Sequence, residues 1–76
     1  MIHLGKLIEE ELRRQERSVA WFSRKLYCDR SNVYDIFKRP SIDSLLLLRI
    51  CQILKYNFFK ELEAHIDDEE EISTEA

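Results

Sequence analysis

The stretch CDRSNVYDIF, residues 28–37, concentrates side chains that could bind the edges of nucleic-acid bases. A guanidinium can donate two hydrogen bonds to guanine O6 and N7, and hydroxyl, amide and carboxylate groups can bond to other base edges in the major groove. The candidate base-contacting residues are Arg30, Ser31, Asn32, Tyr34 and Asp35. The alternative is that these side chains form the solvated surface of one helix in a small bundle.

Charge is divided unevenly along the chain. Residues 13–39 include eight basic and three acidic residues, whereas the chain from residue 64 onward holds six acidic residues and no lysine or arginine. The net charge of −3 therefore conceals a basic segment and an acidic tail. Phosphate groups suit a basic segment, and the candidate phosphate-contacting residues are Arg17, Ser18, Lys38 and Arg39. The acidic tail is either a solubilising end or a competitor with phosphate for the basic face.

No pattern for catalysis or metal binding is visible in the sequence. His3 and His65 stand alone near opposite ends of the chain, and the serines have no histidine with a supporting acid in pattern. Cys28 and Cys51 have no further ligands at zinc spacing, so we expect buried, reduced thiols of a cytoplasmic protein. The run LLLLRICQIL is interrupted by polar residues and is too short to span a bilayer. We expect no enzyme, no cofactor and no membrane partner.

Helices are the elements expected to position these side chains. The chain has one glycine and one proline, too few for a turn-rich β domain, and its apolar residues recur at three- and four-residue steps. This pattern predicts an all-α fold with N-caps at Ser18, Asp29, Ser41 and Asn57. The five predicted helices cover residues 3–15, 18–26, 29–38, 42–54 and 57–65. Residues 67–76 hold much like charge and little apolar surface, so we expect disorder or a frayed helix end there.

The predicted helix at 42–54 has more apolar residues than one face can bury. Its expected core residues are Leu46, Leu47, Ile50, Cys51 and Leu54. Exposed apolar patches usually mark a partner surface. We therefore expect a partner surface at the three remaining apolar residues, Leu45, Leu48 and Ile53. The alternative is a monomer in which the last helix covers them.

Taken in order, these patterns resemble the XRE (lambda-repressor-like) helix-turn-helix family over residues 4–62. LGKLI is similar to the family's opening L-G-x-x-I, SVAWFSRKLYCDRSNVYDI to its T-Q-x-x-L-A-x-x-x-G-v-s-x-s-x-I-x-x-I, and PSIDSLLLLRICQIL to its closing P-s-x…L-x-x-I-A-x-x-L. The resemblance implies a five-helix lambda-repressor-like helix-turn-helix domain at residues 1–66, followed by the acidic tail. In such domains the second helix of the pair enters the major groove with its N-terminal residues leading.

The function expected from this resemblance is sequence-specific binding of double-stranded DNA by a homodimer. Such a protein would regulate transcription as a repressor, with residues 29–38 as the recognition helix and no small-molecule effector evident. The alternative is a protein-interaction module of the same fold, such as an antitoxin-like or adaptor partner.

Several residues depart from the family's pattern or admit two interpretations. Val19 replaces a common glutamine and so removes one expected DNA contact, while Phe37 replaces a common glutamate and either enlarges the core or exposes an aromatic ring. Tyr27 replaces the usual glycine. A left-handed conformation there costs about 1–2 kcal/mol, so the turn either carries this strain or is reshaped. Asp35 either accepts a hydrogen bond from cytosine N4 or pairs with Arg39 one turn on.

Overall fold

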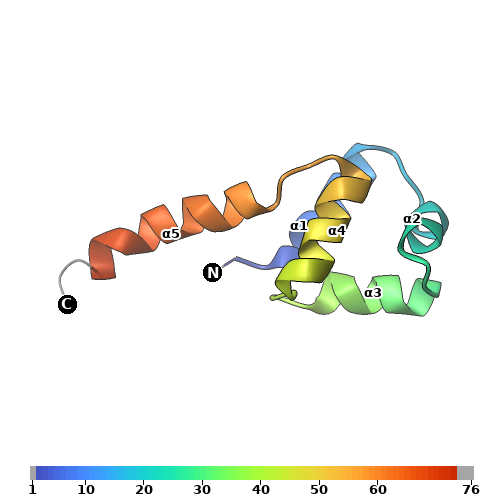
Figure 1. Ribbon diagram of the computed structural model, residues 1–76, viewed down its shortest axis with the longest axis horizontal. Helices are drawn as coiled ribbons and strands as arrows, with labels where there is room; N and C mark the ends of the chain where they lie inside the picture. Colours follow the sequence, from blue (N-terminus) through green and yellow to red (C-terminus); the bar gives the residue numbers. More distant parts are fainter. Residues whose placement is uncertain (1, 74–76) are drawn as a thin grey trace.

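The computed structural model describes the backbone of residues 2–73 and the side chains of residues 2–66. This part of the chain is all-helical and contains no strand, which confirms the all-α part of the prediction. Figure 1 shows a helical bundle from which the last helix extends away. The helices are α1 (Leu4–Arg14), α2 (Val19–Leu26), α3 (Arg30–Lys38), α4 (Ser44–Leu54) and α5 (Phe59–Ser73).

Side chains cap the start of α1 and of α2. The Oγ of Ser18 accepts a hydrogen bond from the Trp21 N–H at 3.0 Å, as predicted for the start of α2. His3 caps α1 in the same way through Nδ1, which accepts from the Lys6 N–H at 3.1 Å. This histidine therefore has a structural role that its isolation in the sequence did not indicate.

The N-caps of α3 and α4 differ in part from the prediction. Asp29 occupies the N-cap position of α3 with an extended backbone, but its carboxylate makes no capping hydrogen bond. The predicted cap at Ser41 is wrong, because α4 begins at Ser44 and Asp43 accepts from the Leu46 N–H at 2.9 Å. Arg39 before Pro40 is extended, and the two residues after Ser41 remain outside the helix.

Twelve buried apolar residues form one core under the helices. α3 packs against α1 and α2, and α2 also contacts α4. Phe22, Phe58 and Ile50 lie fully inside. Two predicted core residues of α4, Leu46 and Cys51, are only partly buried, as is Cys28, because they lie at the edge of this core. The buried residues are Leu4, Ile8, Leu12, Phe22, Leu26, Val33, Ile36, Phe37, Leu47, Ile50, Leu54 and Phe58.

Gly5 lies where α1 meets the end of α3. A Cβ atom at this position would lie 2.4 Å from the carbonyl oxygen of Ile36 and 2.5 Å from that of Phe37. The absence of a side chain lets the Gly5 N–H donate to the carbonyl oxygen of Arg39 at 2.9 Å. The chain thus uses its one glycine for close backbone approach rather than for a turn.

Three of the helices end at non-glycine residues in the left-handed conformation. Glu16, Tyr27 and Lys55 have φ values of 58°, 56° and 54°. The following N–H in each case donates five residues back, from Arg17 to Leu12, from Cys28 to Ser23 and from Tyr56 to Cys51, as in the Schellman motif. The turn at Tyr27 therefore keeps the left-handed conformation and is not reshaped.

α5 begins after the buried Phe58 and continues further than the sequence predicts. Asn57 Oδ1 accepts from the Phe59 N–H at 3.0 Å, consistent with the predicted cap. The expected end at residue 65 is wrong, because the helix continues to Ser73. Residues 69–71 of the extension are glutamates, which have high helix propensity, and the charge pattern alone does not reveal this. Residues 74–76 lie outside the described part.

α5 points away from α4 and leaves Leu45 and Leu48 exposed (Figure 1). The alternative in which the last helix covers these two residues is therefore wrong. Among the described residues, no helix is both long enough and apolar enough to cross a membrane.

Candidate nucleic-acid interface

α2 and α3 are joined by three residues, Tyr27, Cys28 and Asp29. In Figure 1, α2 is seen nearly end-on while α3 lies in the plane of the view, so the two helices cross. The left-handed Tyr27 reverses the chain between them, and its side chain is 87% exposed. The turn therefore fixes the direction of α3 without placing a large side chain in the core.

One side of α3 is buried and the other is open to solvent. Val33, Ile36 and Phe37 face the core. Of the two alternatives for Phe37, the enlarged core is confirmed and the exposed ring is wrong. The predicted base-contacting residues are all exposed: Arg30, Ser31, Asn32, Tyr34 and Asp35. Their side chains have no hydrogen-bonding or ionic partner within the described part of the chain.

Tyr34 lies against Phe37 with the two rings edge to face. The ring centroids are 6.1 Å apart and the planes are inclined by 87°. Such a contact stabilises an aromatic pair by about 0.5–1.5 kcal/mol and limits the motion of the tyrosine ring. The hydroxyl group remains available for a partner, because Tyr34 is 51% exposed.

Basic side chains on α2 and α3 are not neutralised internally. Within the described residues, the ion pairs join Arg13 to Glu9 at 2.8 Å and Arg14 to Glu11, both along α1. The alternative pairing of Asp35 with Arg39 does not occur. Six basic residues between α1 and α4 therefore have no acidic partner in this part of the chain: Arg17, Arg24, Lys25, Arg30, Lys38 and Arg39.

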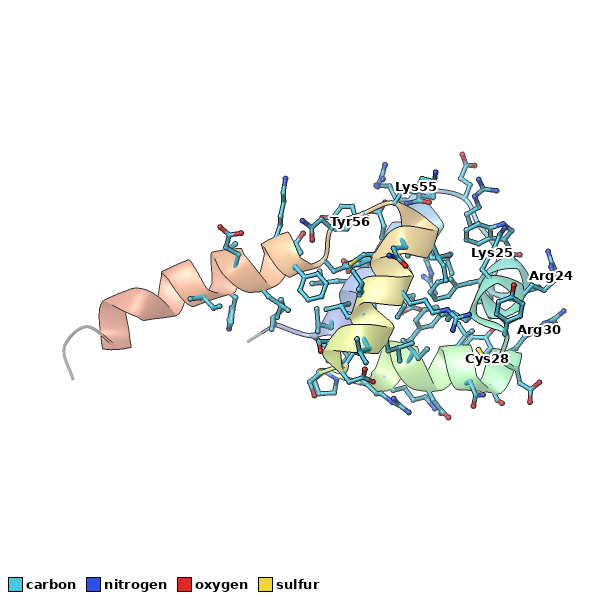
Figure 2. All side chains as sticks on the ribbon, in the orientation of Figure 1. Arg24, Lys25, Cys28, Arg30, Lys55 and Tyr56 are labelled. Atoms are coloured by element: carbon cyan, nitrogen blue, oxygen red, sulfur yellow. The ribbon has the colours of Figure 1, made fainter. Side chains whose placement is uncertain are left out.

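Arg24 and Lys25 on α2 were not among the predicted site residues. Figure 2 shows Arg24 and Arg30 extending at the same end of the molecule, from α2 and from the start of α3. The signal was present in the excess of basic residues between 13 and 39, but the sequence did not show which of them share a surface.

Trp21 orders the basic side chains at the exposed side of α2. The guanidinium of Arg17 lies 4.6 Å from the centre of its ring, and the ammonium of Lys25 lies 5.9 Å from it. Cation–π contacts of this kind contribute about 0.5–1 kcal/mol at exposed sites. Of the predicted phosphate contacts at this helix, Arg17 is held by the indole and Ser18 is occupied as the helix cap through its oxygen lone pair.

A groove lies between α3 and α4. It has a volume of about 210 Å³ and apolar walls that include Leu26, Ile36 and Leu46. Asn32 lies on this flank of α3 rather than at the centre of its exposed side, and Arg39 and Arg49 line the groove as well. Arg49, a further residue absent from the prediction, also stacks on Tyr27 with its guanidinium 5.3 Å from the ring centre.

The predicted dimer residues do not form one patch. Leu45 is 78% exposed and Leu48 is 46% exposed on α4. Ile53, in contrast, is partly buried against the core and lies beside Trp21. The surface left for a symmetric partner is therefore centred on Leu45 and Leu48.

A polar network behind the site joins α1 to the end of α4. The buried carboxylate of Glu11 accepts hydrogen bonds from Arg14 and from Gln15, and these bonds lower the pKa of Glu11. The same Gln15 amide donates to the carbonyl oxygen of Leu54 at 2.7 Å, which satisfies a free carbonyl at the end of α4. Nearby, Tyr56 donates to Glu61 at 2.5 Å, and this bond raises the pKa of the Tyr56 hydroxyl.

The two cysteines are free thiols at the edge of the core. Burial and the neighbouring Asp29 raise the pKa of Cys28, so its thiol is protonated at neutral pH. No group of three or more histidine, cysteine or acidic side chains suited to a metal ion is present among the described residues.

Comparisons of the chain with protein-family models, with curated proteins and with solved structures find no match. The functional conclusion therefore depends on the geometry and chemistry of this surface.

Proposed function

We propose that this chain is a double-stranded DNA-binding regulator of transcription, with a lambda-repressor-like helix-turn-helix fold and α3 as its recognition helix. The observation that carries the proposal is the exposed side of α3. It combines polar side chains without internal partners with a short, rigid connection to α2. In a helix-turn-helix pair, the second helix lies in the major groove while the first crosses the backbone.

The polar side chains of α3 supply the chemistry for reading bases. Arg30 stands in the first turn, where a recognition helix makes its base contacts, and it can form two hydrogen bonds with guanine. Ser31 follows Arg30. The ring of Tyr34 lies edge to face with the ring of Phe37, three residues later. Asp35 can accept from cytosine N4 and would weaken binding where it meets phosphate instead.

The unpaired basic residues supply the affinity for phosphate. Duplex binding by such residues releases condensed counterions, so the logarithm of affinity falls with the logarithm of salt concentration with a slope of about −0.9 per phosphate contact. Full engagement of the six unpaired cations would give a slope of about −5 for each protomer. Lys38 and Arg39 at the end of α3, with Arg17 before α2, are the proposed phosphate contacts.

A homodimer would place two α3 helices on successive half-sites. Two-fold symmetry of the protein then requires an inverted repeat in the DNA. The exposed Leu45 and Leu48 are the proposed contacts between protomers, because a small polar-surfaced protein rarely leaves adjacent leucines open to water.

A second candidate function, a protein-interaction module, is favoured by one specific observation. The groove between α3 and α4 has apolar walls, and α4, which forms one of them, also carries the exposed Leu45 and Leu48. An amphipathic helix of a partner could bury its apolar side there. In that case the basic residues of α2 and α3 would not govern binding.

Selection of bound sequences from random duplex DNA tests the proposed function directly. An enriched palindromic site, bound with a steep salt dependence, is the expected result. A chain that shows no salt-sensitive retention on random duplex at low salt would instead favour the interaction module, and the search would turn to protein partners.

A further inference from the structure

A recess of about 720 Å³ opens between the exposed side of α2 and the end of α4. It lies outside the side of α3 that carries the proposed base contacts. Trp21 and Ile53 give it apolar walls, and Gln52 offers an amide at its rim.

Three cations, Arg17, Lys25 and Lys55, line this recess, and no acidic side chain does. None of the three has an ionic partner within the described part of the chain. The nearest acid along the sequence, Glu16, belongs to the preceding loop and does not line the recess. The recess therefore has an uncompensated positive charge.

The cations come from three separate segments of the chain. Arg17 precedes α2, Lys25 lies near its end, and Lys55 is the left-handed residue that ends α4. In the view of Figure 2, Lys55, Lys25, Arg24 and Arg30 follow the same edge of the molecule. This edge continues the positive charge of the α2 and α3 pair toward the end of α4.

Trp21 positions the guanidinium of Arg17 beside the recess. Its ring holds the guanidinium of Arg17 at 4.6 Å, so less side-chain entropy is lost when Arg17 binds a ligand. The open shape and the point charges of the two lysines suit a solvated phosphodiester better than an enclosed organic ligand. A nucleic-acid backbone also presents successive phosphates, and three cations line this recess.

We infer that this recess is a second phosphate-binding site, which holds the DNA backbone flanking the segment contacted by α3 through Arg17, Lys25 and Lys55. The inference rests on the proposed function and extends the DNA-contacting surface to the end of α4. Lys25 and Lys55 then act on every sequence equally, because phosphate contacts carry no base information.

The test compares two double variants with the same change of charge. Lys25→Gln with Lys55→Gln removes two cations of the recess, whereas Lys6→Gln with Lys60→Gln removes two exposed lysines from α1 and α5. Affinity for random duplex is measured against salt concentration for the full chain and for both variants. The expected result is a salt slope smaller by about 2 for the recess variant only. Thermal unfolding of both variants serves as the control for structure.

Fluorescence of Trp21 gives a second, independent measurement, since it is the only tryptophan in the chain. Duplex DNA added to the full chain is expected to change this emission, and Arg17→Gln is expected to reduce the change. A synthetic peptide of residues 67–76 is the matched acidic ligand. A response to this peptide and not to duplex would overturn the phosphate assignment in favour of an acidic protein segment.

These measurements test the second phosphate site separately from the proposed DNA-binding function. Wild-type binding with an unchanged salt slope in the recess variant overturns the second site and leaves the proposed function intact. Absence of duplex binding by the unmodified chain overturns both.

Discussion

The backbone N–H of Gly5 donates to the carbonyl oxygen of Arg39 at 2.9 Å, and this bond joins the start of α1 to the end of α3. The adjacent Leu4 N–H donates to the carbonyl oxygen of Pro40 at 3.0 Å. Both bonds require the backbone of α1 to approach the end of α3 closely, and a side chain at position 5 would collide with the carbonyl oxygens there. The position of the proposed recognition helix thus depends on a residue at the far end of the sequence.

Gly5→Ala is expected to lower the free energy of unfolding by about 2 kcal/mol. Overpacking costs roughly 1–3 kcal/mol, and a gain in helix propensity of about 1 kcal/mol opposes it only in part. Thermal denaturation should show a decrease in Tm of roughly 8–16 °C for a domain of this size. Lys6→Ala, at the next and exposed position, is the control. A Gly5→Ala protein as stable as the wild type would show that the backbones separate at little cost.

Glycine at the left-handed helix ends is expected to stabilise the fold. Glu16→Gly should raise the free energy of unfolding by about 1 kcal/mol, since a left-handed residue with a Cβ is strained by roughly 1–2 kcal/mol. Tyr27→Gly should give less, because it also removes the contact with Arg49. Chemical denaturation measures both. A decrease on Glu16→Gly would mean that its side chain makes a stabilising contact in solution.

Arg30→Ala should reduce discrimination between DNA sites more than it reduces random binding. Loss of a bidentate contact with guanine removes about 1–3 kcal/mol of discrimination at one base pair. Competition binding with the selected site and with single-base variants measures this difference. Lys38→Ala is the matched control at the other end of α3 and should weaken all duplexes alike. Equal losses for Arg30→Ala on every duplex would reassign Arg30 to phosphate.

Stability should fall at acidic pH because of Glu11. Hydrogen bonds from Arg14 and Gln15 lower the pKa of Glu11 in the folded chain, so its contribution is complete above the ordinary value of 4.5. It is lost as the pH falls through the lower folded pKa, since the unfolded chain then binds the proton more readily. Unfolding experiments from pH 6 downward should show less of this decline in Glu11→Gln. Glu10→Gln, one residue earlier and exposed, should behave like the wild type.

Leu45→Glu with Leu48→Glu should separate a dimer into monomers. Two carboxylates facing their symmetry mates would be desolvated and would repel each other. Sedimentation measures the change in mass, and affinity for the palindromic site should fall while the affinity of a single half-site persists. Lys6→Glu, at an exposed position of α1, changes the net charge by the same amount and is the control. A wild-type chain that sediments as a monomer at all concentrations would remove Leu45 and Leu48 from the proposal.

Local patterns in the sequence predicted much of the fold. Apolar residues at three- and four-residue steps predicted the helices, and Ser18 marked the start of α2, because both signals act within a few residues. The competition between Ser41 and Asp43 for the cap of α4 was not resolvable in this way. Both have good capping side chains, and packing after Pro40 decides between them.

Contacts between residues far apart in the sequence could not be predicted from local patterns. Lys55 and Arg17 lie 38 positions apart and share one recess only because α4 ends beside the start of α2. Arg49 and Tyr27 meet for a similar reason. The exposed state of the predicted base-contacting residues follows from the helical period, whereas the grouping of basic residues into surfaces follows from the packing of whole helices.

The direction of α5 has a practical meaning for handling the protein. Because this helix leaves the bundle on the side away from α2 (Figure 1), a tag or surface linkage joined after it is held at a distance from the α2 and α3 pair. The amino-terminal end of α1, in contrast, lies one residue before the hydrogen bond between Gly5 and Arg39. Immobilisation through the carboxyl end should therefore leave the proposed DNA-contacting surface unobstructed, whereas a bulky amino-terminal fusion would lie close to the junction that orients α3.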